Sequence, residues 1–122
     1  MTEDRLELGS LGEKLAIKKI KKLGYKLIES NYRCPLGEID VIAKDGECLV
    51  FLEIKTRKGR STAYAKESID QRKIRQISKV ALFYMKVNNC LDSKSRFDVV
   101  AININGNKID LEIIPNAFDL AY

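Results

Sequence analysis

The sequence predicts an α/β fold in which helices flank a mixed β-sheet. Two long segments carry apolar residues at helical spacing, and five shorter apolar segments are separated by turn signals. The predicted order is helix, three strands, helix, strand, strand. The length of 122 residues suits a single domain, 1–122, with a core at about 6–114 that needs neither a disulfide nor a metal to fold.

The first half of the chain is predicted to contain a helix and three strands. The helix covers residues 6–23, with leucines and isoleucines on one side and lysines on much of the rest, and Gly24 ends it. The three strands follow at residues 25–28, 38–43 and 48–55. Asp45-Gly46 predicts the hairpin turn between the last two strands.

The second half begins with a basic segment, residues 55–60, which is expected to be a mobile loop. A helix is then predicted over residues 65–86. Its apolar side contains Ile69, Ile74, Ile77, Val80, Ala81 and Tyr84, and its polar side contains Arg72, Lys73, Arg75 and Lys79. The last two strands are expected at 97–104 and 109–114, with Pro115 ending the second.

Composition excludes several kinds of chemistry. The chain has no histidine, which removes His-based general bases, catalytic triads and His-ligated zinc. Cys34, Cys48 and Cys90 lie far apart without a C-x-x-C pair, so neither a zinc site nor a disulfide framework is expected. A bound metal would therefore have oxygen ligands, which favours Mg²⁺, Mn²⁺ or Ca²⁺.

The charge and the N-terminus indicate the cellular setting. A net charge of +5 and a pI of about 9.1 permit a polyanionic partner without proving one. Residues 1–5 are polar, with no apolar core of a signal peptide, and no run approaches the ~18 apolar residues of a membrane span. We therefore expect a cytoplasmic protein that does not associate with membranes.

The predicted hairpin carries the candidate active centre. A turn at Asp45-Gly46 places Asp40 opposite Phe51 and Glu38 opposite Glu53. Because side chains alternate along a strand, one face carries Glu38, Asp40, Glu53 and Lys55, and the other carries Ile39, Val41, Val50, Leu52 and Ile54.

Three carboxylates on one strand face repel one another unless a cation lies between them. Asp40 and Glu53 are expected diagonally, roughly 7–8 Å apart, where they can share one hard cation, Mg²⁺ or Mn²⁺. Lys55 can position an attacking water or balance charge on a phosphoryl transition state. The alternative is a solvated strand face with ordinary Glu–Lys pairing, which the apolar run 49–52 disfavours.

Several motifs resemble the YraN-type family of small bacterial proteins over nearly the whole chain. They include Gly12-Glu13, Gly37-Glu38-Ile39-Asp40, Phe51-Leu52-Glu53-Ile54-Lys55-Thr56-Arg57 and Arg96-Phe97-Asp98-Val99-Val100. That family is similar to the PD-(D/E)xK, or restriction-endonuclease-like, nucleases, including archaeal Holliday junction resolvases. The resemblance implies an α-β-β-β-α-β core, metal ligation by Asp40 and Glu53, and Lys55 as the catalytic lysine.

The resemblance also implies supporting residues. Glu13 would be a further acidic member of the site, although Ser10-Leu11-Gly12-Glu13 equally fits a capping box at a helix start. Gln71 and Lys73 would support the site or touch phosphate, or else belong to a solvated helix face. The remaining candidates for phosphate contacts are in the basic segment: Arg57, Lys58 and Arg60.

Three functions therefore remain open at the level of sequence. The first is a metal-dependent endonuclease acting on nucleic acid, foremost DNA, and in particular branched or single-stranded DNA. The second is a non-catalytic nucleic-acid-binding module on the same fold, and the third is a protein-interaction module with an acidic partner. A resolvase-like role would require a homodimer to reach two strands.

Overall fold

The computed structural model describes residues 2–59 and 69–119, with residues 2–6 described by their backbone alone. The elements in chain order are α1 (Thr2–Lys22), β1 (Lys26–Cys34), β2 (Gly37–Asp45), β3 (Cys48–Lys58), α2 (Gln71–Val87), β4 (Ser95–Asn105) and β5 (Lys108–Phe118). This order confirms the predicted α/β fold class with its α-β-β-β-α-β core, which one more strand follows.

The five strands form one sheet in the order β1-β2-β3-β4-β5. The β1–β2, β2–β3 and β4–β5 pairs are antiparallel, whereas β3 and β4 are parallel. A parallel pair needs a long crossover connection, and α2 lies in that connection. The sheet is therefore mixed, as predicted.

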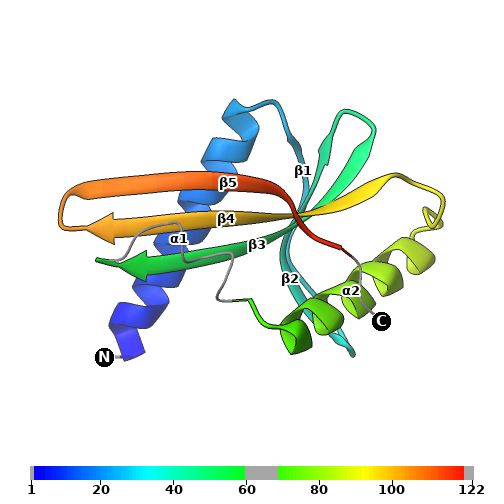
Figure 1. The fold of residues 1–122 in the computed structure, drawn as a ribbon, viewed down its shortest axis with the longest axis horizontal. Coiled ribbons are helices and arrows are strands. Elements are labelled where there is room, and N and C mark those ends of the chain that lie inside the picture. The colour runs from blue at the N-terminus through cyan, green and yellow to red at the C-terminus, as the bar shows by residue number, and fades with distance from the viewer. Residues whose placement is uncertain (1, 60–68, 120–122) are drawn as a thin grey trace.

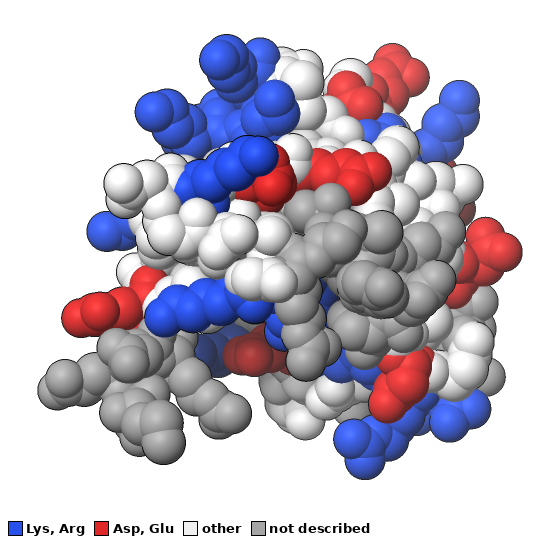
Figure 2. Space-filling model, turned by 60° about the vertical axis from the view of Figure 1, so that its left-hand side comes forward, with Lys and Arg blue, Asp and Glu red and all other residues white. Residues whose placement is uncertain are grey.

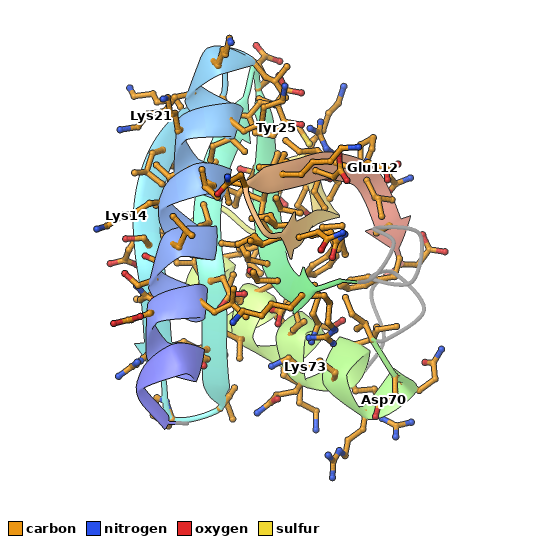
Figure 3. All side chains as sticks on the ribbon, turned by 90° about the vertical axis from the view of Figure 1, so that its left-hand side faces the viewer. Lys14, Lys21, Tyr25, Asp70, Lys73 and Glu112 are labelled. Carbon is orange, nitrogen blue, oxygen red and sulfur yellow. The ribbon has the colours of Figure 1, made fainter. Side chains whose placement is uncertain are left out.

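The two helices cover opposite faces of this sheet. Ala16 and Ile20 of α1 belong to a core cluster with Val50 and other side chains of β2, β3 and β4. Ile77 and Val80 of α2 belong to a second cluster with further side chains of the same three strands. Figure 1 shows α1 crossing behind the strands, and Figure 3 shows the sheet between the two helices. Because both faces are covered, β2 and β3 have nearly continuous apolar runs.

The register of the β2–β3 hairpin differs from the prediction. Asp45 pairs with Cys48 and Val41 with Leu52, so the turn is Gly46-Glu47 rather than Asp45-Gly46. Gly46 has a φ of 61°, and the first position of a type II′ turn requires such a positive φ. The predicted pairs Asp40–Phe51 and Glu38–Glu53 are therefore wrong. Each β2 residue pairs with a β3 residue two positions later than predicted. Because side chains alternate with a period of two, this shift leaves the face on which each β3 side chain lies unchanged.

Strict alternation also fails at one point of β2. Ile39 packs in the α2-side cluster with Phe51, whereas Val41 packs in the α1-side cluster, so the prediction that Ile39 and Val41 share a face is wrong. Phe51, the predicted partner of Asp40, pairs with Ile42 and is buried in the α2-side cluster. The change occurs at Asp40, just beyond the last β2–β3 pair, where the Ile54 N–H donates to the Asp40 carboxylate.

Other boundaries differ as well. β1 continues from residue 28 to Cys34 and pairs along β2, with Pro35-Leu36 as the turn. β3 continues to Lys58, so Arg57 and Lys58 belong to a strand and not to the expected loop. Arg60 and the predicted helix start at residue 65 lie outside the described residues.

The start of α2 also lies later than predicted. Asp70 has an extended backbone with a ψ of 171°, and its carboxylate accepts a hydrogen bond of 2.9 Å from the Lys73 N–H. This is the geometry of an N-cap, so the helix begins at Gln71. Ile69 precedes the helix but is still buried.

Pro115 does not end the last strand, because β5 continues to Phe118. β5 is an edge strand, where a proline without an N–H is tolerated. The pairing with β4 shifts between Phe97 and Val99, and Asn116 has a φ of 50°. The Asn116 N–H donates to the buried Asp98 carboxylate at 2.9 Å, which anchors this irregularity.

Among residues 2–59 and 69–119, neither helix has the length and apolar character needed to cross a membrane.

Candidate active site

Asp40 lies on β2 where the pairing with β3 ends. Its Oδ2 accepts a hydrogen bond of 2.8 Å from the Ile54 backbone N–H, so the side chain takes the place of a strand carbonyl. Burial raises the pKa of Asp40, and the nearby Glu38 charge acts in the same direction. The Ile54 hydrogen bond and the Lys73 charge oppose that rise in pKa. The site therefore holds this carboxylate rigidly in a poorly solvated position.

Glu53 lies on β3 and is 8% exposed. Asp40 is its neighbour across the strands, since the Asp40 carboxylate is bound to the N–H of Ile54, the next residue along β3. Burial raises the pKa of Glu53 to about 7, and the charge of Asp40 adds to the rise. Lys73 of α2 opposes the rise, with its Nζ 3.8 Å from Glu53 Oε1. Two poorly solvated carboxylates side by side are stabilised by positive charge, whether an ammonium or a metal cation.

Lys55 follows Glu53 by two residues on β3. Its charge lowers the pKa of both Asp40 and Glu53, so its ammonium group lies within electrostatic reach of both. The structure thus brings the three central residues of the sequence prediction together where the β2–β3 pairing ends.

Two clefts meet at Lys55, each with a volume of about 840 Å³. The α1 cleft contains the acidic residues Glu13, Glu38 and Asp40, together with Leu8, Gly9, Ser10, Asn31, Ile54, Lys55, Thr56 and Arg57. The α2 cleft is mainly basic and is lined by Pro35, Leu36, Lys55, Asp70, Arg72, Lys73, Arg75, Gln76 and Lys79. Figure 2 shows basic and acidic side chains close together on one face of the molecule.

Glu13 lies in the interior of α1, because that helix already begins at Thr2. The capping-box interpretation of Ser10 and Glu13 is therefore wrong. Glu13 Oε1 accepts a hydrogen bond of 2.8 Å from Asn31 Nδ2 on β1, which fixes the carboxylate at the wall of the α1 cleft. Close contact between Gly12 and Thr56 brings this part of α1 against β3.

Glu38 has a different environment from the other two predicted metal ligands. Its carboxylate is exposed and pairs with Arg33 at 3.2 Å. In the described part of the chain, no three acidic or cysteine side chains form a group that could hold a metal, so Glu38 does not complete a ligand set with Asp40 and Glu53. Mg²⁺ commonly binds through one or two carboxylates with water and phosphate oxygens as its other ligands, and Asp40 and Glu53 fit that requirement.

The predicted phosphate-contacting residues are dispersed. Arg57 lines the α1 cleft, whereas Lys58 lines a separate small hollow with Leu11 and Ile104. Gln71 is exposed and is not among the described residues that line either cleft. Lys73 lines the α2 cleft and is the ionic partner of Glu53. Figure 3 shows Lys73 within α2 and Asp70 at its start.

The sequence interpretation did not assign a role in the site to Arg72, Arg75 and Lys79 of the α2 cleft. The signal that would have identified them is charge placement, because α2 has no acidic residue in its first turn while its cations begin there. Repulsion from the helix dipole makes that placement unfavourable unless an anion lies nearby.

Arg96 and Asp98 form an ion pair of 3.0 Å that is not part of the candidate site. Asp98 is fully buried and accepts hydrogen bonds from Arg96, Tyr25 and the Asn116 N–H. Arg96 also pairs with Asp45 at 2.9 Å. This network joins Tyr25, in the segment between α1 and β1, to β2, β4 and β5.

The fold and the site define a class of small α/β proteins that carry two poorly solvated carboxylates and a lysine where two central strands of a mixed sheet separate. The chain belongs to the family described as "Uncharacterised protein family UPF0102", the YraN-type family, whose model matches residues 12–102. That range includes Glu13, Asp40, Glu53 and Lys55.

The chain is similar over nearly its whole length to other members of this family. It is 44% identical over 115 residues to a UPF0102 protein of Geobacter metallireducens, covering 94% of each chain. It is 39% identical over 122 residues to one of Syntrophus aciditrophicus, covering 100% of this chain and 95% of the relative. A Caldicellulosiruptor saccharolyticus relative is 38% identical over 117 residues, covering 94% and 99%.

Proposed function

We propose that this protein is a metal-dependent endonuclease that hydrolyses phosphodiester bonds in nucleic acid, and that its preferred substrate is DNA. The observation that carries the proposal is the pair of poorly solvated carboxylates, half-buried Asp40 and buried Glu53, beside Lys55 where two clefts meet. Two neighbouring carboxylates that are shielded from water lower the stability of the folded protein. A cation bound between them would offset this loss, so the arrangement is typical of a functional site. The resemblance of the motifs around these residues to the PD-(D/E)xK nucleases supports the same assignment.

Asp40 and Glu53 would hold Mg²⁺ or Mn²⁺, which when bound lowers the pKa of a water molecule and polarises the phosphate. The Ile54 N–H fixes the Asp40 carboxylate, so its remaining oxygen is oriented before a ligand arrives. The Lys55 ammonium orients the attacking water or stabilises the negative charge of the transition state. Glu13, fixed by Asn31 across the α1 cleft, can accept a hydrogen bond from a water molecule there.

The test is cleavage of labelled single-stranded, duplex and four-way-junction DNA, and of single-stranded RNA, with Mg²⁺ or Mn²⁺. We expect the parent protein to cut at least one substrate and Asp40→Asn to lower the rate by at least about a hundredfold. Asn can still accept the Ile54 hydrogen bond, so the fold is retained. Asp110→Asn, the same change at an exposed position of β5, is the matched control and should cut normally. Equal activity of Asp40→Asn and the parent would contradict the proposal.

A non-catalytic nucleic-acid-binding module is the second candidate, and the cations of the α2 cleft favour it. This function predicts binding that weakens steeply with salt and persists when metal is removed. It would be preferred if all four substrates bind but none is cut by the parent protein in Mg²⁺ or Mn²⁺.

A further inference from the structure

We propose that the α2 cleft binds a single-stranded segment of nucleic acid, with its phosphates along Arg72, Arg75 and Lys79 and its bases against Pro35 and Leu36. The inference rests on the proposed function, which makes the ligand a nucleic acid. It adds that the nucleic acid is single-stranded where it binds and that it reaches the candidate site through the α2 cleft. The evidence comes from the charges of α2, from the opposite wall of the cleft and from the position of Lys55.

The charge pattern of α2 is unfavourable for an isolated protein. Its sequence, QRKIRQISKVALFYMKV, contains five Lys and Arg residues and no Asp or Glu. Arg72, Lys73 and Arg75 lie in the first two turns, where the positive end of the helix dipole repels cations, and the single negative charge of the Asp70 N-cap is outnumbered by these three. Arg75 and Lys79 are four residues apart, a spacing at which like charges also repel. A bound polyanion would relieve both kinds of repulsion.

The basic residues of α1 do not give the same indication. Lys19, Lys21 and Lys22 lie in its last turn, where the dipole favours cations. In Figure 3, Lys14 and Lys21 point away from the body of the protein. α1 also carries like charges four residues apart, at Lys14, Lys18 and Lys22, so the helices differ in the dipole alone. Only α2 has its cations concentrated at the end where the dipole is unfavourable, and this singles it out.

The cations of α2 are also available to a ligand. Arg72, Arg75 and Lys79 are exposed, and none of them forms an ion pair with another residue that the structure describes. Lys73 is engaged by Glu53 instead. Three unpaired cations at spacings of three and four residues form one stripe along a wall of the cleft.

The opposite wall is apolar and preformed. It is the β1–β2 turn, Pro35-Leu36, in which Leu36 is 47% exposed. Gly37, directly after the turn, has a φ of 142°, and a methyl group added to it would lie 2.9 Å from Gln76 Nε2. The turn therefore rests directly on α2, which fixes the two walls relative to each other.

One basic wall facing one apolar wall suits a single strand, because the backbone can lie along the charges while exposed base faces meet apolar side chains. A duplex hides its base faces in the stack and offers the apolar wall nothing to contact. The composition of the cleft therefore favours a single-stranded segment over a duplex.

Lys55 sets the direction of the bound strand. It lines the α2 cleft and also the α1 cleft, whose acidic members Glu13, Glu38 and Asp40 repel phosphates. A strand that follows the α2 cleft to Lys55 therefore ends at the border with the α1 cleft. A phosphate there lies beside Asp40 and Glu53, where a bound divalent cation would offset the repulsion and the proposed chemistry would occur.

The first experiment measures binding without cleavage. A fluorescein-labelled oligothymidylate and a hairpin duplex of equal length are titrated with protein in a chelator, with fluorescence anisotropy read over a range of salt. The test variant is Arg72→Gln/Arg75→Gln/Lys79→Gln. The matched control is Lys14→Gln/Lys18→Gln/Lys21→Gln, which removes three exposed charges of the same sign from the other helix.

We expect the parent to bind the oligothymidylate more tightly than the duplex. The α2 variant should lose about a hundredfold in affinity at about 50 mM salt, and its salt slope should fall by about 2, for three phosphates at ~0.7 each. The α1 variant should stay within about threefold of the parent, with an unchanged slope. The melting temperature of the α2 variant should not fall, since the change removes repulsion, so lost binding cannot be attributed to unfolding.

A second variant tests the apolar wall. Leu36→Ser should weaken oligothymidylate binding while leaving the salt slope unchanged, because it removes apolar contact and no charge. Tighter binding of the duplex, equal losses in the two triple variants, or wild-type binding by Leu36→Ser would each overturn the proposal.

These experiments test the α2 cleft and the proposed nuclease activity separately. Selective loss of binding in the α2 variant, with no cleavage by any protein in Mg²⁺ or Mn²⁺, supports the cleft and contradicts the nuclease. Cleavage of single strands by the α2 variant at the parental kcat/KM supports the nuclease and contradicts the cleft.

Discussion

Glu53 makes the stability of the protein depend on pH. Its pKa is about 7 in the folded protein against an ordinary value of 4.5, so the folded state binds more protons than the unfolded state between these limits. Stability from this group is fully present below pH 4.5 and is lost as the pH rises through 7. Glu53→Gln should therefore be more stable than the parent at pH 8, by about 3 kcal/mol at most, and nearly equal to it at pH 4.

Urea unfolding in a chelator at the two pH values measures this difference. Glu47→Gln, the same change at the exposed β2–β3 turn, serves as the control and should follow the parent at both pH values. A parent that gains stability relative to Glu53→Gln as the pH rises would show that the buried carboxylate has a different environment.

Lys73 compensates part of the charge of Glu53 in the absence of metal. Its Nζ lies 3.8 Å from Glu53 Oε1, and it lowers the pKa of both carboxylates. Lys73→Gln should reduce the free energy of unfolding by about 1 kcal/mol at pH 8, since Lys73 is partly exposed and solvent weakens the pair. At pH 5, where Glu53 is mostly protonated, the loss should largely disappear. Lys79→Gln on the same helix should show no such pH-dependent loss of stability.

At the scale of elements, the position of α1 depends on the absence of a side chain at Gly12. A methyl group there would overlap the Thr56 hydroxyl and lie 3.2 Å from Thr56 Cβ, so α1 would have to move away from β3. Gly12→Ala should lower the free energy of unfolding by about 1–3 kcal/mol despite the better helix propensity of alanine.

Gly9 provides the matched control for Gly12 in the same helix. No atom lies within 4 Å of a Cβ built at Gly9, so Gly9→Ala should stabilise the protein by up to about 1 kcal/mol. Thermal melts of the two variants measure both effects. If both substitutions stabilise the protein equally, α1 does not pack as closely on β3 as the structure indicates.

The elements that could be predicted from the sequence are those with a strong local pattern. The apolar runs of β3 and β4 and the periodicity of both helices predicted these elements correctly, apart from their ends. The errors lie where a contact with a residue distant in the sequence determines the end or the direction of an element. Pro115 ends a strand by local rules, yet β5 continues because it is an edge strand and because the Asn116 N–H binds Asp98, a residue 18 positions away.

The candidate site likewise has a part that local sequence patterns predict and a part that depends on tertiary contacts. Side-chain parity placed Glu53 and Lys55 on one face of β3, since a two-residue register error preserves parity. The turn of Asp40 towards Ile54, the pairing of Lys73 with Glu53 and the α2 cleft all depend on how β2 and α2 pack against β3. None of these contacts is encoded in a local spacing, so the sequence could not predict them.

At the scale of the whole molecule, the two helices leave only a limited place for chemistry. α1 covers one face of the sheet and α2 the other, and the charged side chains of the central strands that line the two clefts gather where β2 and β3 separate. Both helices contribute at that point, α1 through Glu13 and α2 through Lys73. Anything that binds between Asp40 and Glu53 should therefore stabilise all three layers together.

This arrangement predicts that a divalent cation stabilises the entire fold. A ligand that binds only the folded state at one hundred times its Kd adds about 2.7 kcal/mol to the free energy of unfolding. Mn²⁺ or Mg²⁺ should therefore raise the melting temperature of the parent in one cooperative transition, and Asp40→Asn should lose this effect while Asp110→Asn keeps it. Because a ligand carboxylate must be deprotonated, the shift should be larger at pH 8 than at pH 6, given the pKa of about 7 for Glu53. Calorimetric melts at both pH values, with and without the metal, measure the shift. An equal shift in Asp40→Asn would place the cation elsewhere on the protein and would remove the main support for a metal-dependent activity.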